Sequence, residues 1–132
     1  MRQIQYLTQL LQQIIFKKNN NQKQEAIQKI NNALERVTKG HPKQFHKLEL
    51  KETISLFIQN ETYQAELALA VADLLVEKAE MLAKKKYSQS QKAYLQALLL
   101  YKKAQFDDEA AVPLDIHQKI THIKKSYLVR IH

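Results

Sequence analysis

Histidine is the residue type in this chain best suited to metal binding or proton transfer, because the sequence has no cysteine. The five histidines are His41, His46, His117, His122 and His132. His117 and His122 are five residues apart and would point to different faces of a helix, whereas helical metal-binding pairs are spaced by three or four. No histidine follows a carboxylate at the Glu-x-x-His spacing of di-iron bundles. The sequence therefore predicts structural histidines, with no metal and no cofactor.

Glu77 and Glu80 would be neighbours on a helix, and paired carboxylates can act as general acid and base when burial separates their pKa values. Lys78 and Lys84 lie close by in the sequence. This pattern favours a solvent-exposed face on which Glu80 pairs with Lys84, four residues further on. We interpret the two acids as surface residues and not as catalytic groups.

Other catalytic signatures are missing from the sequence. Without cysteine there can be no disulfide, thiolate zinc site, iron–sulfur cluster or cysteine nucleophile. The single glycine, Gly40, cannot form a dinucleotide-binding or phosphate-binding glycine loop, and no serine lies in a glycine-flanked nucleophile elbow. We therefore expect a protein that is not an enzyme.

The composition indicates which secondary structure would position the histidine and carboxylate side chains. The chain has 132 residues, which suits one domain, and 45% of them are hydrophobic, enough for a buried core. With 1 Gly and 2 Pro there is little material for the tight turns of a β domain. The sequence predicts a single all-α domain of five or six helices.

Apolar residues at helical spacing mark the expected elements. The helices should cover about residues 3–17, 22–39, 50–58, 62–86, 90–106 and 113–131. Gly40 followed by Pro42 should stop the second helix. Asn60 or Thr62 should cap the long fourth helix, and Ser88 with Gln91 fits a capping box for the fifth. Pro113 suits the first turn of the last helix, about 113–131.

The N-terminal segment carries glutamines among its apolar residues and is not a secretory signal, and no stretch approaches the ~20 apolar residues of a membrane span. The polar side of the first helix is mostly neutral glutamine, which argues against a membrane-surface role. The sequence therefore predicts a cytoplasmic protein that does not bind membranes.

Aromatic and small residues alternate in the segment 62–106 at the spacing of a tetratricopeptide repeat, in which alanines let paired helices approach closely. The repeat positions are Ala79, Leu82, Tyr94, Ala97, Tyr101 and Ala104. Tyr94 and Tyr101 should therefore lie in the core and not on a surface that stacks on bases. Leu82 and Tyr94 are twelve residues apart where the repeat has about six, so the helices should be longer or their connection looser.

The opening RQIQYLTQLLQQIIF, the QEAIQKINNAL helix and the tetratricopeptide-like hairpin together resemble a family of small uncharacterised bacterial helical proteins. The resemblance covers nearly the whole chain in the order of its elements. It implies the helical fold and carries no assigned activity.

The net charge of +8 could attract nucleic acid or an acidic partner. Most basic residues fall at predicted helix ends, where they offset the helix dipole. The candidate basic surface consists of Lys84, Lys85, Lys86, Lys102, Lys103, Lys124 and Lys125. Nucleic-acid binding requires that helix packing bring several of these ends onto one surface.

The sequence thus predicts an N-terminal hairpin over 1–39, a tetratricopeptide-like hairpin over 62–106 and a terminal helix over 113–131. The predicted role is non-catalytic interaction with a protein or peptide partner, held in a groove between helices. Two repeat-like units leave apolar surface uncovered, so the first or last helix should also contribute to a homodimer. The alternative is a basic helical protein that binds nucleic acid.

Overall fold

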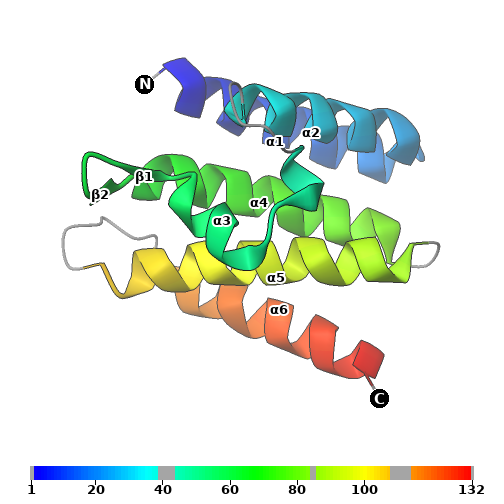
Figure 1. Cartoon of the computed structure of the whole chain (residues 1–132). Coiled ribbons are helices and arrows are strands. Elements are labelled where there is room, and N and C mark those ends of the chain that lie inside the picture. Colours follow the sequence, from blue (N-terminus) through cyan, green and yellow to red (C-terminus); the bar gives the residue numbers. More distant parts are fainter. Residues whose placement is uncertain (1, 39–43, 84–85, 108–113, 132) are drawn as a thin grey trace.

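Six α-helices account for most of the chain in the computed structural model, which describes residues 2–38, 44–83, 86–107 and 114–131 (Figure 1). Their bounds are α1 Arg2–Asn19, α2 Lys23–Val37, α3 Leu50–Ser55, α4 Ala65–Leu82, α5 Tyr87–Gln105 and α6 Ile116–Ile131. A 3₁₀ turn, η1 (Phe45–Lys47), precedes α3, and a hairpin of two-residue strands, β1 (Ile58–Gln59) and β2 (Thr62–Tyr63), follows it. The predicted all-α fold is confirmed.

The long helices are stacked in chain order (Figure 1). α1 packs against α2, and α4 packs against both helices of this first hairpin. α5 forms with α4 the most extensive helix pair of the described chain, and α6 packs on α5 at the opposite edge. η1 and α3 cover one face of α5. The result is a series of antiparallel helices whose first and last members form the two edges.

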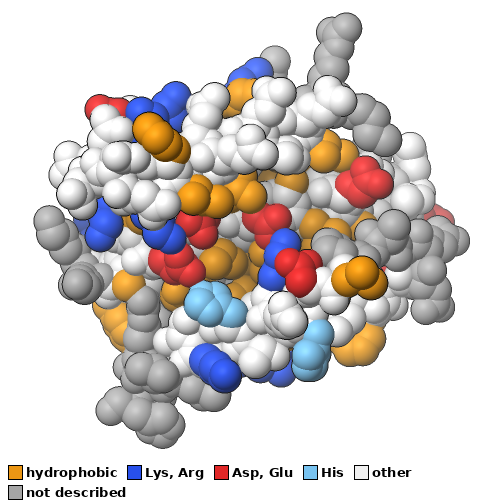
Figure 2. Space-filling model, turned by 180° about the vertical axis from the view of Figure 1, so that it is seen from behind, with side chains coloured by type: hydrophobic (Ala, Val, Ile, Leu, Met, Phe, Trp, Pro, Cys, Tyr) orange, Lys and Arg blue, Asp and Glu red, His pale blue; other side chains and the backbone are white. Residues whose placement is uncertain are grey.

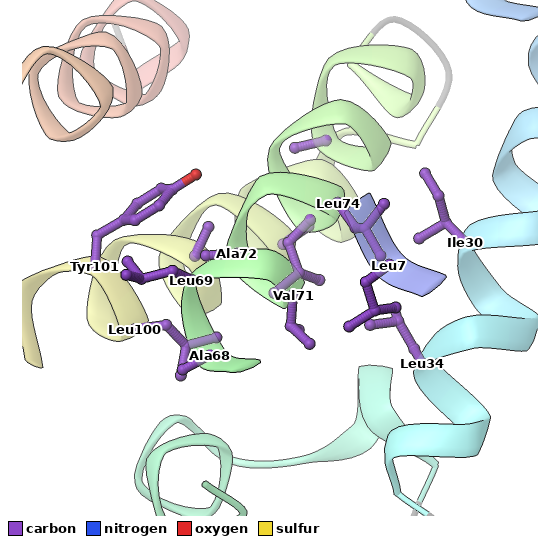
Figure 3. Close-up of a cluster of buried hydrophobic side chains, with 14 of the residues drawn as sticks. Leu7, Ile30, Leu34, Ala68, Leu69, Val71, Ala72, Leu74, Leu100 and Tyr101 are labelled. Carbon is purple, nitrogen blue, oxygen red and sulfur yellow. The ribbon is translucent and has the colours of Figure 1, made fainter. Parts of the chain in front are cut away.

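The hydrophobic core runs through the centre of this stack (Figure 3). Leu7 of α1 and Ile30 of α2 meet Leu74 of α4, and each of these side chains is at most 2% exposed. α4 and α5, which form the most extensive helix pair, both carry fully buried small residues, among them Ala72 and Ala97. Replacing a buried leucine by alanine in such a core costs about 2–5 kcal/mol.

The six repeat positions predicted from the sequence are all buried. Their exposed fractions are Ala79 0%, Leu82 7%, Tyr94 1%, Ala97 0%, Tyr101 1% and Ala104 0%. The prediction that Tyr94 and Tyr101 belong to the core is therefore confirmed.

Two predicted helix starts are wrong. α5 begins at Tyr87 with Lys86 as its N-cap, so Ser88 lies inside the helix and forms no capping box. α4 is preceded by Gln64, and neither Asn60 nor Thr62 caps it. α4 therefore starts later than its predicted cap indicates, and α5 starts earlier.

The helix expected over 50–58 ends at Ser55, and the chain then forms the β1–β2 hairpin. Asn60 and Glu61 both have positive φ, at 53° and 64°, as in the turn that joins two-residue hairpins. The hydroxyl of Tyr63 donates to the carbonyl oxygen of Leu100 at 2.9 Å. This buried hydrogen bond ties the hairpin to α5 and gives a tertiary reason for the shortened helix.

The remaining boundaries agree closely with the sequence pattern. α1 extends the expected 3–17 by one residue at its start and two at its end, and α2 lies within 22–39. Gly40, Pro42 and Pro113 lie outside the described residues. None of the helices in the described ranges combines the length and the apolar character of a bilayer span.

Candidate functional site

Several charged side chains lie in a band across the side of the molecule that α1, α4 and α6 form (Figure 2). We call this band, made of Lys18, Asp73, Glu77, Glu80, Lys119 and His122, the charged face. Figure 2 shows acidic and basic side chains among hydrophobic ones, between two ridges. Asp73, Glu77 and Glu80 share one side of α4 because their spacing of four and three residues follows the helical repeat.

Lys18 connects the end of α1 to two of these carboxylates. Its ammonium donates to Glu77 Oε1 at 3.0 Å and to Glu80 Oε2 at 2.7 Å. Burial alone would lower the pKa of Lys18, but its hydrogen bonds to Glu80 and Glu77 raise it above the usual value. The two carboxylates therefore hold this lysine in its charged form.

His122 contacts Glu80 from the other edge, with its Nε2 2.9 Å from Oε1. Burial would raise the pKa of Glu80, but hydrogen bonds to Lys18 and His122 outweigh it and the pKa is lowered. Glu80 thus lies between a cation of α1 and an imidazole of α6. It is held ionised and is poorly suited to donate a proton near neutral pH.

Asp73 forms the second centre of the charged face. Its Oδ1 accepts a hydrogen bond from Lys119 Nζ at 3.0 Å and another from the hydroxyl of Tyr101. The ammonium of Lys119 also lies 5.8 Å from the centre of the Tyr101 ring. Burial, followed by the charge of Asp73, raises the pKa of Tyr101, so its hydroxyl stays protonated and serves as a donor.

These contacts correct the sequence interpretation of Glu77 and Glu80. Their side chains are 15% and 28% exposed, so they are not on an open solvated surface. Glu80 pairs with Lys18 and His122, while its expected partner Lys84 lies outside the described residues. Local spacing could not reveal Lys18, which is 59 residues from Glu77.

The other histidines are scattered. His46 lies in η1 and His117 at the exposed start of α6, while His41 and His132 are outside the described residues. Within the described ranges, no three histidine or acidic side chains gather closely enough to hold a metal ion.

The predicted basic surface is spread out. Lys86 precedes the first residue of α5 and Lys102 belongs to its last turn, so a rise of 1.5 Å per residue separates them by about 24 Å. This exceeds the screening length of about 10 Å at 0.1 M salt. Lys103, Lys124 and Lys125 are exposed or nearly so, and Lys84 and Lys85 lie outside the described residues. Lys86 and Lys102 therefore cannot share one compact patch.

Comparisons with protein families, with curated proteins and with solved structures give no match to this chain.

Proposed function

We propose that the protein is a non-catalytic protein–protein interaction module of tetratricopeptide-like type, which binds a basic segment of a partner protein on its charged face. The proposal keeps the resemblance to small bacterial helical proteins with such hairpins. The partner segment would lie along α4, between α1 and α6.

The order of helix contacts supports this reading. Two antiparallel hairpins, α1–α2 and α4–α5, are followed by the single helix α6, and α4 contacts both helices of the preceding hairpin. Stacked helix pairs of this kind bury a continuous core and leave the first helix of each pair on one shared side. On that side the present chain places the charged face.

The local charge of this face indicates the chemistry of the segment that it would bind. Asp73, Glu77 and Glu80 contribute −3, and Lys18 and Lys119 contribute +2, which leaves −1 with neutral His122. This local sign is opposite to the net charge of +8 of the whole chain. Complementary potentials favour lysine or arginine in the bound segment, together with apolar residues that cover the surrounding hydrophobic surface.

Selection of displayed random peptides on the full-length protein tests the proposal. We expect enriched peptides with at least one Lys or Arg beside apolar residues, and weaker binding of these peptides to Asp73→Asn by about tenfold. Glu66→Gln is the matched control, because Glu66 is an exposed acid in the first turn of the same helix. Selection of no peptide, or equal binding to both variants, would contradict the proposal.

The homodimer contact is supported by apolar exposure at the end of α1. Phe16 is 66% exposed and Ile15 is 41% exposed. Light scattering of the purified protein should show a dimer that Phe16→Ser converts to a monomer. A monomer at high concentration in the unmodified protein would rule the dimer out.

A salt titration against generic DNA and RNA separates the interaction module from the nucleic-acid alternative. Backbone binding weakens steeply as salt rises. Because Lys86 and Lys102 lie at opposite ends of α5, we expect no salt-dependent binding of this kind.

A further inference from the structure

Lys78 of α4 is a buried lysine that makes no hydrogen bond or ion pair with the residues that the structure describes. It is only 8% exposed. Burial lowers the pKa of Lys78, and the negative charge of Glu35 opposes this only in part. Lysine is almost never buried unless it is paired, so this side chain requires an explanation.

The side chain opens onto a small cavity. The cavity has a volume of about 250 Å³ and is lined by His46, Lys78, Ser88, Gln89, Lys92, Ala93 and Gln96. No side-chain nitrogen or oxygen of the described chain is both fully buried and unsatisfied, so the Lys78 ammonium is not completely enclosed, and Lys78 is part of the cavity lining. We call this space the basic cavity.

Two buried sets of hydrogen bonds fix the cavity walls. Ser90 Oγ donates to the carbonyl oxygen of Ala79 at 2.7 Å, which holds the first turn of α5 against the part of α4 that carries Lys78. Gln96 Nε2 donates to the carbonyl oxygen of Phe45 and to Thr53 Oγ1, both at 3.2 Å. These bonds hold η1, and with it His46, against α5. The cavity is therefore built by rigid elements.

The start of α5 adds hydrogen-bond donors to this wall. Lys86 is its N-cap and provides no side-chain cap, and the first backbone bond of the helix is donated by Ser90 to Lys86. The N–H groups of Ser88 and Gln89 precede that bond and have no partner within the helix. Backbone N–H groups and the positive end of the dipole make a helix N-terminus favourable for anions.

The surrounding charges are predominantly positive. Burial, and then the charges of Lys78, Lys47 and Lys92, lower the pKa of His46, while Glu35 alone opposes them. Lys78 and Lys92 both line the cavity, so a bound group with a charge near −2 would balance them. A phosphoryl group carries about −1.5 to −2 at pH 7, and lysine binds phosphate as a point charge.

We propose that the basic cavity is a binding site for a phosphate group, either inorganic phosphate or the phosphoryl group of a small molecule. Its volume lies below the about 300–1,000 Å³ of sites for drug-sized ligands, which suits a ligand of few atoms. This site is separate from the charged face and does not depend on the interaction function proposed above.

Titration calorimetry of the full-length protein with sodium phosphate, at constant ionic strength set by sodium chloride, tests the site. We expect saturable binding that weakens about tenfold or more in Lys78→Met. Lys51→Met is the control, because Lys51 is an exposed lysine of α3 outside the cavity and its loss changes the net charge equally. Absence of saturable phosphate binding, or equal affinity in both variants, would overturn the proposal.

Glycerol phosphate in a second titration distinguishes the two sources of the phosphate group. Tighter binding than that of inorganic phosphate assigns the site to a phosphorylated small molecule, and weaker binding assigns it to the free ion. With either ligand, the His46 imidazole should titrate at higher pH once the ligand is bound, because an anion beside His46 favours the imidazolium. Nuclear magnetic resonance measures this titration. Binding of an oligonucleotide without any response to phosphate would contradict the site.

Discussion

The charged face and the basic cavity place ionised groups of the same helix, α4, in opposite situations. On the charged face each of Asp73, Glu77 and Glu80 has a cation or donor at 2.7–3.0 Å. In the basic cavity Lys78 is more deeply buried than they are and has no hydrogen-bond or ion-pair partner within the described ranges. Residue 78 follows Glu77 by one position, which turns it by about 100° around the helix axis.

This difference separates a structural role from a binding role. Breaking a buried pair is costly because it leaves a charge that neither water nor protein compensates. Lys78 is compensated by no ion pair with the described residues, whereas on the charged face the contacts between α1, α4 and α6 pair the charges. The partner binding proposed for the face and the anion binding proposed for the cavity would therefore use the same helix, α4, in two different ways.

The largest change in stability should come from removing Asp73, the acid that accepts hydrogen bonds from Lys119 and Tyr101. Asp73→Ala leaves Lys119 and the Tyr101 hydroxyl without their shared acceptor, and we expect a loss of about 2–3 kcal/mol in the free energy of unfolding. Chemical denaturation measures this loss. Asp115→Ala is the control, because Asp115 lies 4.0 Å from Lys119 and is 53% exposed. Asp115→Ala should lower the free energy of unfolding by less than about 0.5 kcal/mol. Similar losses in both variants would show that the contacts of Asp73 do not stabilise the charged face.

Lys18→Met should have the next largest effect, about 1–2 kcal/mol, because Glu77 and Glu80 lose their common cation. The pKa of Glu80 is lowered in the folded state, so its contribution is present above 4.5 and is lost as pH falls through the folded pKa. The stability difference between the two proteins should therefore shrink in acid. Denaturation at neutral pH and near pH 3 measures it, with Lys51→Met, at an exposed lysine of α3, as the control. A difference independent of pH would contradict this account.

Lys78→Met should change stability in the opposite direction. Exchanging an unpaired buried ammonium for an apolar side chain of similar length should stabilise the phosphate-free protein by about 1 kcal/mol. Because the folded pKa of Lys78 is lowered, its cost is complete below that pKa and disappears as pH rises towards 10.5. The advantage of the variant, measured by thermal unfolding, should fall with rising pH. Destabilisation by Lys78→Met at pH 7 would show that the lysine is satisfied in the folded state.

The smallest effect should come from His46, which is exposed and faces Lys47, Lys78 and Lys92, with Glu35 as its one acidic neighbour. Its pKa is lowered in the folded protein, so stability should fall as pH drops through and below 6.5. His46→Gln should remove this small dependence, which thermal unfolding between pH 7.5 and 5 would detect. His117→Gln, at another exposed histidine, is the control. An identical pH dependence in His46→Gln and the unmodified protein would show that the positive charges around the cavity do not act on His46.

The sequence supported the prediction of the helices and of the buried repeat positions, because both depend on local periodicity. Tyr94 and Ala97 are recognisable as core residues from their spacing alone. The start of α5 was predicted too late because Ser88 and Gln91 fit a local capping box, whereas the helix already begins at Tyr87 and Ser88 lies inside it. The β1–β2 hairpin was missed since its two-residue strands are too short to show an alternating pattern.

The candidate sites followed only in part from the sequence. Glu77 and Glu80 drew attention through their spacing, but Lys18 and Lys119 could not be assigned to them without the packing of α1 and α6. Lys78 was visible only as a lysine beside two acids. Nothing in a local pattern indicates that it turns away from those acids into a cavity formed by α5 and η1.

Composition and helical periodicity are local properties, and they suffice to predict a helical chain without cysteine or glycine-loop chemistry. Which charges are paired depends on how the helices pack. Ion pairs such as Lys18 with Glu80 join residues 62 positions apart. The cavity at Lys78 is lined by η1, which precedes α4 in the chain, and by α5, which follows it. Charge pairing and desolvation are properties of distances in space, and these exist only once the helices have packed.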